Sequence, residues 1–351
     1  MSAFSPPILA LPADAAAAAR EALGLGPSET IRIAYLPGPG DLRETYRYWR
    51  RGEHDPRLPK HRLFDDVFRA LSGAWAGRGA ASYPRPRARA CHEEPGFEFV
   101  CIPYRTRPGA ASYYLGRFAY ARDCLKALKG FRPHVAVIAS DFDWQAMPLV
   151  RGAAGKVILS LHNTYWPMGL EQFGLGRRAA NLPMAAALGS IDAAVCTSNE
   201  CDRQLRRLLG RDLPSFVAVP QQAARLPAPP PPAERPSRLL YLGRVEEPKG
   251  VFDLLDAFEG LRRTRPSLSL VYAGGGGALP ALRDEIARRN LADAVKTPGH
   301  LDQAGAKDAL AQADILVCPT RSSFLEGLAF VCFEAAVHGA PTVMSSVVPA
   351  A

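Results

Sequence analysis

Short apolar runs, each about the length of one buried strand, recur along this chain and are separated by stretches with helical character. Continuous apolar strands are typical of parallel sheets that are covered by helices on both faces. The runs fall at residues 31–36, 134–139, 157–161, 191–198, 216–220, 238–242, 268–272 and 315–318. This alternation predicts an α/β protein built from doubly wound sheets.

The length of the chain and one proline-rich stretch predict two domains. A chain of 351 residues exceeds what a single hydrophobic core usually holds. Residues 223–237 read AARLPAPPPPAERPS, which is the composition of a stiff linker. We therefore expect an extension over residues 1–29, a first domain over 30–222, the linker over 223–237 and a second domain over 238–351.

The composition indicates where the protein works. Its seven cysteines form no C-x-x-C pair and no metal-ligand spacing with histidine, so we expect free thiols and a reducing cytoplasm. The N-terminus lacks the basic region of a signal peptide, and no run is long enough to span a bilayer, so membrane contact would be peripheral. The formal net charge of +9 is compatible with nucleotide phosphates or acidic lipid and is weak evidence for either.

The stretch after the strand at residues 315–318 carries two carboxylates. We expect a helix that starts at Glu326-Gly327 and ends near Gly339 and Pro341. Glu326 and Glu334 would then lie roughly 12 Å apart along the axis. They could hold two ends of a long ligand whose negative middle lies over the helix N-terminus. Alternatively, Glu326 is only a helix-start carboxylate and Glu334 a solvated one.

This stretch, EGLAFVCFE followed by AAVHGAP, resembles the E-x7-E signature of the retaining glycosyltransferases of family 4, which have the GT-B fold. The resemblance implies two Rossmann-like domains that face a cleft. It also implies that Glu326 is a catalytic residue facing the donor sugar and that Glu334 holds the ribose hydroxyls. Gly327 and Leu328 would lie beside them in the donor site.

A second motif supports the same resemblance. Arg244 and Lys249 stand in the pattern G-R-x-x-x-x-K-G, in which the family uses both cations to hold a diphosphate. Fixed cations can meet the negative charge of a departing nucleoside diphosphate without a metal ion. Beside Glu246 and Glu247, the same two side chains could instead form ordinary surface ion pairs.

The first domain has weaker signals. His162 follows the strand at residues 157–161, and the resemblance implies that it is a catalytic residue facing the donor sugar. Gly38 and Gly40 follow the first strand and are second-rank donor-site candidates, although an ordinary turn is favoured. A dinucleotide fingerprint would need a third glycine where Arg43 stands, so we expect no nicotinamide or flavin cofactor.

Two other patterns are interpreted as not catalytic. Asp141 and Asp143 form a D-x-D pair, which resembles the metal site of another class of sugar transferases but is interpreted as turn chemistry. Residues 41–51 (DLRETYRYWRR), together with Arg85, Arg87 and Arg89, mix basic and aromatic side chains. We favour a solvated loop with buried aromatic rings there. Contact with an anionic membrane is the alternative, and no nucleic-acid motif accompanies them.

These patterns together predict a retaining, metal-independent transferase that needs no cofactor. It would move a hexosyl group from a nucleotide-diphospho-sugar to a sugar or lipid-linked acceptor in cell-envelope or exopolysaccharide synthesis. The sequence ends before the last strands and closing helix of its relatives, so the resemblance implies a truncated donor domain. An inactive or fragmentary binding module and a GT-B nucleotide-sugar epimerase are the alternatives.

Overall fold

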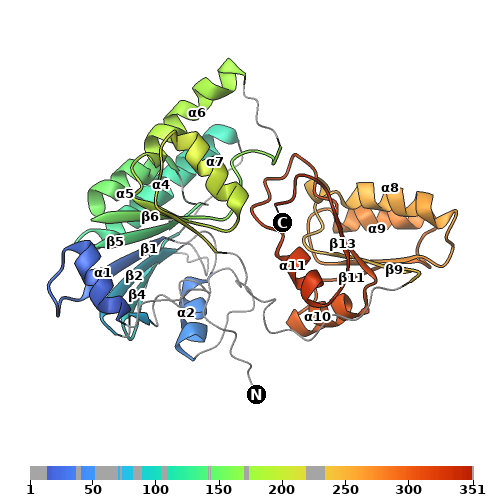
Figure 1. Ribbon diagram of the computed structural model, residues 1–351, viewed down its shortest axis with the longest axis horizontal. Helices are drawn as coiled ribbons and strands as arrows, with labels where there is room; N and C mark the ends of the chain where they lie inside the picture. The colour runs from blue at the N-terminus through green and yellow to red at the C-terminus, as the bar shows by residue number, and fades with distance from the viewer. Residues whose placement is uncertain are drawn as a thin grey trace. The chain divides into compact units, whose positions relative to one another are not determined.

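The computed structural model describes residues 14–36, 41–51, 70–71, 73–81, 89–103, 109–140, 142, 144–169, 174–218 and 234–349. The chain divides into two compact units (Figure 1). The first contains Met1–His162 and Gln172–Val219, and the second contains Pro220–Ala351 together with the short loop Asn163–Glu171. No helix in the described ranges is both long and apolar enough to cross a membrane.

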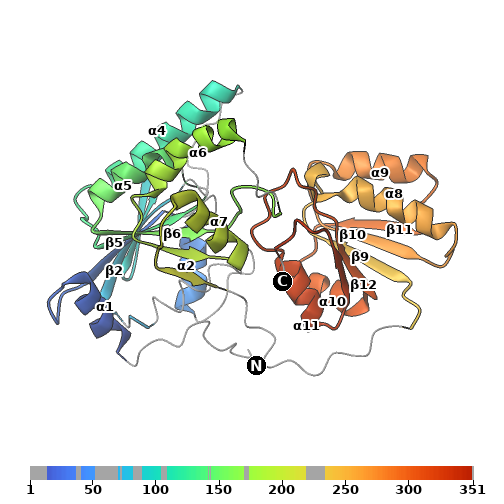
Figure 2. The ribbon, with the colours of Figure 1, turned by 45° about the horizontal axis from the view of Figure 1, so that its top comes forward.

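The first unit contains an eight-stranded sheet with the order β3-β4-β2-β1-β5-β6-β7-β8. Neighbouring strands pair parallel except β3 and β4, which form an antiparallel pair. Figure 2 shows α4, α5 and α6 along one face of this sheet. The strands are β1 (Ile31–Leu36), β2 (Trp75–Ala81), β3 (Ala90–Glu94), β4 (Phe97–Cys101), β5 (Val135–Ala139), β6 (Lys156–Leu161), β7 (Ala193–Cys196) and β8 (Ser215–Val217). The helices are α1 (Ala15–Leu23), α2 (Leu42–Arg50), α4 (Ala110–Leu128), η2 (Trp144–Ala146), α5 (Met147–Ala153), α6 (Leu175–Leu188) and α7 (Asn199–Leu209).

The stretch that we expected to be a solvated loop, residues 41–51, contains the helix α2, so that prediction was wrong. Leu42 and Tyr46 lie one turn apart on the helix and are both buried. The ring of Tyr46 packs 5.0 Å from Phe97, centroid to centroid, and its hydroxyl donates a hydrogen bond of 2.7 Å to the carbonyl of Pro95. The buried aromatic side chain thus belongs to an amphipathic helix. Arg85 and Arg87 lie outside the described residues.

The second unit contains a five-stranded, all-parallel sheet with the order β11-β10-β9-β12-β13. Its strands are β9 (Arg238–Leu242), β10 (Ser269–Ala273), β11 (Val295–Gly299), β12 (Ile315–Cys318) and β13 (Thr342–Met344). Its helices are η4 (Glu247–Lys249), α8 (Val251–Arg262), α9 (Leu279–Arg288), α10 (Gln303–Gln312) and α11 (Phe330–Val337). The strand order reverses between β9 and β12, and ligands of such sheets bind at the carboxyl ends of the strands at that point.

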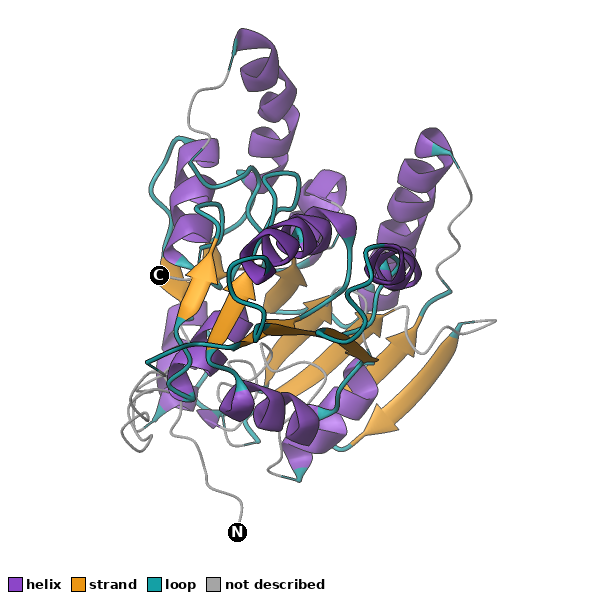
Figure 3. Ribbon diagram, turned by 90° about the vertical axis from the view of Figure 1, so that its right-hand side faces the viewer, coloured by secondary structure: helices purple, strands orange, loops and turns teal. Residues whose placement is uncertain are grey.

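Helices flank the sheets of the protein (Figure 3), as the alternation of helices and strands predicts. In the second unit, two apolar clusters cover the two faces of the sheet. One cluster holds Leu255 and Phe258 of α8 with Leu282 of α9. The other holds Leu310 of α10 and Ala335 of α11. The Rossmann-like α/β class expected for this part of the chain is therefore confirmed.

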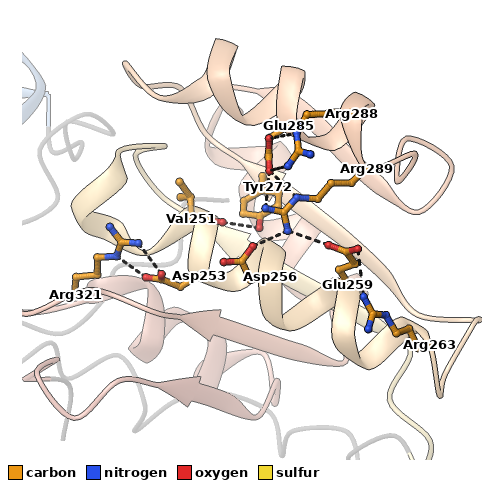
Figure 4. Close-up of polar contacts among 10 residues, drawn as sticks. All are labelled: Val251, Asp253, Asp256, Glu259, Arg263, Tyr272, Glu285, Arg288, Arg289 and Arg321. Atoms are coloured by element: carbon orange, nitrogen blue, oxygen red, sulfur yellow. Dashed lines mark hydrogen bonds and ion pairs between the residues drawn. The ribbon is translucent and has the colours of Figure 1, made fainter.

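A surface network of ion pairs links α8 to α9 (Figure 4). The guanidinium of Arg289 lies 2.6 Å from Asp256, 3.0 Å from Glu259 and 2.6 Å from Glu285. Beneath this network, the buried hydroxyl of Tyr272 donates a hydrogen bond of 2.9 Å to the carbonyl of Val251. The first residue of α8 is thereby fixed to the strand β10, directly after the predicted diphosphate motif.

The glycine run after β10 packs against a neighbouring loop. Gly274 has a φ of +152°, and a Cβ atom there would lie 1.8 Å from the carbonyl oxygen of Gly243. The backbone N–H of Val245 donates to the carbonyl of Gly275 at 2.9 Å. The close contact that the structure describes at these glycines is therefore between two loops of the protein itself.

Candidate functional site

Three residues predicted from the sequence meet at the carboxyl edge of the second sheet. Lys249 follows β9, and Glu326 follows β12, 77 positions later in the chain. The ammonium group of Lys249 forms an ion pair with the carboxylate of Glu326, and their side chains are only 15% and 11% exposed. Arg244 lies on the loop that joins β9 to η4 and is 61% exposed.

One aromatic residue, which the sequence analysis did not single out, joins these charges. The ring centroid of Phe324 lies 4.1 Å from Nζ of Lys249 and 5.4 Å from Cζ of Arg244. Arg244 also donates a hydrogen bond of 2.9 Å to Glu246. Phe324 stands two positions before Glu326, and that spacing alone does not indicate contact with a cation.

The backbone brings the two strands that carry these residues close together. Gly250 has a φ of +74°, and a Cβ atom there would lie 2.0 Å from the carbonyl oxygen of Pro319. Only glycine fits such an approach in the left-handed region. The hydroxyl of Tyr241 donates a 2.5 Å hydrogen bond to the carbonyl of Arg244, which fixes the turn after β9.

The predicted start of the last helix was wrong. The helix α11 begins at Phe330, four residues after Glu326, so Glu326 and Glu334 do not lie on one helix and the 12 Å estimate does not apply. The side chain of Glu326 is held instead by its contact with Lys249. Gly327 and Leu328 are buried in the segment before the helix. No side chain among the described residues caps the first turn of α11.

Glu334 lies within α11, and burial raises the pKa of its carboxyl group. Lys307 and His338 oppose this effect because their positive charges favour the ionised form. The protein therefore keeps a carboxyl group in a place where its negative charge is unfavourable without a partner.

We expect Glu334→Gln to have opposite effects on folding and on nucleotide binding. A raised pKa in the folded state means that stability is lost as the pH rises from about 4.3 through the folded value, and glutamine removes that loss. The variant should therefore gain stability relative to the wild type as the pH rises above about 4, measured by thermal unfolding. Its affinity for a nucleoside diphosphate should fall by about tenfold, or 1.4 kcal/mol. A 2′,3′-dideoxy ligand lacks the ribose hydroxyls and should bind the wild type less tightly than the normal ligand does. If the affinity falls by the same factor in Glu334→Gln, a role of Glu334 at the ribose is contradicted.

His162 lies at the carboxyl end of β6 in the first unit and is 9% exposed. Its ring nitrogen Nε2 is 3.0 Å from the hydroxyl oxygen of Ser160, and its backbone N–H donates to the hydroxyl of Ser140 at 3.1 Å. These contacts fix the imidazole within the first unit. Its predicted action on the donor sugar stays a prediction.

The loop after His162 contributes to the second unit. The hydroxyl of Thr164 donates a hydrogen bond of 3.3 Å to the backbone carbonyl of Glu326. The same loop carries Trp166, which is 2% exposed. The sequence analysis assigned no function to Thr164 or Trp166.

Four candidates cannot be placed. Gly38, Gly40, Asp141 and Asp143 all lie outside the described residues. In the rest of the chain, as far as the structure describes it, no group of three His, Cys, Asp or Glu side chains is arranged to hold a metal ion.

Solved structures with the same fold include synthases from two bacteria. A UDP-forming α,α-trehalose-phosphate synthase from Burkholderia xenovorans aligns with a TM-score of 0.64 at 12% identity, over 92% of this chain and 86% of that one. A sucrose-phosphate synthase from Thermosynechococcus elongatus aligns with a TM-score of 0.60 at 16% identity, over 91% and 82%. The predicted GT-B fold class is confirmed by these similarities.

Sequence comparison adds a match to part of the chain. A glycogen synthase from Mycobacterium tuberculosis is 34% identical over 159 residues, which are 44% of this chain. The match covers 38% of the length of that relative, well under half. The model of the family described as Glycosyl transferases group 1 matches residues 224–351, the part of the chain that carries Arg244, Lys249, Phe324 and Glu326.

Proposed function

We propose that this protein is a glycosyltransferase that moves a hexosyl group from a nucleotide-diphospho-sugar to an acceptor. The observation that carries the proposal is the convergence of Arg244, Lys249 and Glu326 at the carboxyl edge of the second sheet. That edge is where parallel α/β sheets bind nucleotides. The match to the Glycosyl transferases group 1 family over the same residues supports the proposal.

In the proposed mechanism, Arg244 and Lys249 bind the diphosphate of the donor. When the bond between the sugar and the diphosphate breaks, negative charge grows on the leaving oxygen, and the two cations stabilise it without a metal ion. The backbone N–H groups at the start of α11 supply further donors. Glu334 accepts hydrogen bonds from the ribose, while Glu326 and His162 orient the sugar. The anomeric configuration is retained.

The acceptor in this proposal is a sugar or a lipid-linked sugar, used in cell-envelope or exopolysaccharide assembly. The names of the relatives support a sugar acceptor, since they include a glycogen synthase and a UDP-forming trehalose-phosphate synthase. UDP is therefore the first nucleotide to test. We propose an anionic membrane surface as a further partner only if the acceptor proves to be lipid-linked.

The test measures UDP binding by calorimetry. Arg244→Ala and Lys249→Ala should each lower the affinity for UDP by about tenfold to a hundredfold, because each removes a charge-assisted contact of about 1.5–3 kcal/mol. EDTA should leave binding intact. Arg288→Ala is the matched control, since it removes one positive charge from the exposed surface of α9. A requirement for a divalent ion would contradict the metal-free mechanism.

Turnover separates this function from the alternatives. With a UDP-sugar and no acceptor, a transferase should slowly release UDP and free sugar. An epimerase should instead interconvert the sugars of the donor. A binding module should bind the donor and leave it unchanged.

A further inference from the structure

The turn that carries Phe324 is fastened to the segment that carries Lys249. The backbone N–H of Arg321 donates a 3.0 Å hydrogen bond to the carbonyl of Pro248. Its guanidinium forms two hydrogen bonds, of 2.5 and 2.6 Å, with the carboxylate of Asp253 in α8 (Figure 4). The N–H of Phe324 in turn donates to the carbonyl of Arg321 at 3.1 Å. The position of the aromatic ring is therefore set by the same elements that position Lys249.

The ring contacts both cations that the proposed function assigns to the diphosphate. A cation is attracted to an aromatic face when it lies within about 6 Å of the centroid, and Lys249 at 4.1 Å and Arg244 at 5.4 Å both satisfy this condition. Two positive charges near one point repel each other. Each cation is paired with its own carboxylate, Lys249 with Glu326 and Arg244 with Glu246. Both cations also lie against the same aromatic face, which opposes their separation.

Phe324 contributes little to the hydrophobic core. It is only half-buried, and its neighbours Ser322 and Ser323 are exposed, as is Leu325. It belongs to neither of the two apolar clusters of the second unit. Its ring lies against the two cations.

We propose that Phe324 is a positioning residue that holds Arg244 and Lys249 side by side, so that both reach one diphosphate. The inference rests on the proposed function and deepens it, because it makes the site selective for a diphosphate over a single phosphate. A ligand with one phosphate engages the two cations less completely, so it depends less on their alignment.

The experiment compares the binding of UDP, UMP and uridine by calorimetry in the wild type and in Phe324→Leu. The variant should lose about tenfold in affinity for UDP, less for UMP and nothing for uridine, given the usual strength of cation–π contacts. Phe324→Tyr should retain wild-type affinity because it keeps the aromatic face. Leu325→Ala, on the same turn and 38% exposed, is the control and should bind UDP normally.

A double-mutant cycle shows whether the ring acts through the cations. In a Lys249→Ala background, Phe324→Leu should cost about threefold instead of tenfold, because half of the cation contacts are already gone. If Phe324→Leu lowers the UDP affinity as much in the Lys249→Ala background as in the wild type, the ring contacts the ligand itself and the inference is overturned. Unchanged UDP affinity in Phe324→Leu would also overturn it, whereas a wild type that binds neither UDP nor any other nucleoside diphosphate would overturn the proposed function instead. If Phe324→Leu unfolds, Phe324→Met, of similar volume and without a π face, replaces it.

Discussion

Replacing Asp314 by alanine should lower the free energy of unfolding of the second unit by about 3–5 kcal/mol, because it removes the buried acceptor of several hydrogen bonds to a charged group, each worth about 1.5–3 kcal/mol. Asp314 is 8% exposed and lies just before β12. Its carboxylate accepts hydrogen bonds from the backbone N–H groups of Ser237 and Arg238, at 2.8 and 2.9 Å. It also accepts a 2.7 Å hydrogen bond from the guanidinium of Arg238. One carboxylate thus joins the start of β9 to the start of β12.

The same contacts predict how the effect depends on pH. The guanidinium and backbone donors hold the pKa of Asp314 far below its usual range. A depressed pKa contributes stability that is present above the unfolded value of about 3.9 and is lost as the pH falls towards the folded value. The difference in free energy of unfolding between the wild type and Asp314→Asn, measured by urea unfolding, should therefore shrink below pH 4.

Asp302→Ala is the control for Asp314→Ala. It removes a single N-cap hydrogen bond from α10 and should cost only about 1 kcal/mol of stability. Equal losses in Asp302→Ala and Asp314→Ala would contradict the prediction.

Removing either partner of the Lys249–Glu326 pair alone should cost more stability than removing both. A partly buried charge left without its partner costs about 3 kcal/mol, whereas the double variant Lys249→Met with Glu326→Gln leaves no uncompensated charge. Urea unfolding of the four proteins would give the coupling energy. Arg262 and Asp293 form a control pair whose carboxylate is 65% exposed. In the same cycle on this pair, the stability losses of the two single variants should nearly add up to the loss of the double variant.

Binding provides a second measurement on this pair. Glu326→Gln should raise the affinity for UDP, because the ammonium of Lys249 no longer faces a carboxylate. Transfer from a UDP-sugar should nevertheless fall strongly if Glu326 orients the sugar. A loss of UDP affinity in Glu326→Gln would show that the carboxylate supports the diphosphate site and does not compete for Lys249.

The strands of the second unit could be predicted because most of them are continuous apolar runs. Three strands of the first unit, β2 to β4, were missed. β2 and β3 lack that signal, whereas β4 reads FEFVC and was missed although it ends in a short apolar run. β2 reads WAGRGAA, and its glycine Gly77 leaves room for the ring of Phe97, since a Cβ atom there would lie 2.3 Å from it. β3 reads ACHEE and pairs at the sheet edge, where no apolar alternation is required. α2 was missed because its buried face is small and includes a polar residue, with Leu42, Thr45 and Tyr46 as its buried side chains among the described residues.

The site was predictable where a local motif carried it. Arg244, Lys249 and Glu326 stand in short patterns, and the structure brings them together. The helix start was wrong because the position of Glu326 depends on Lys249, which is 77 residues away. Phe324 could not be predicted, since nothing in its spacing indicates that its ring will meet two cations from another loop.

The loop Asn163–Glu171 belongs to the second unit although both of its flanks belong to the first. The chain therefore passes between the units three times, at residues 162–163, 171–172 and 219–220. A protease that cuts within residues 223–237 would break only the last of these connections. The N-terminal fragment would still carry Thr164 and Trp166 as part of the other unit, so the two fragments should elute together under native conditions and separate only in denaturant.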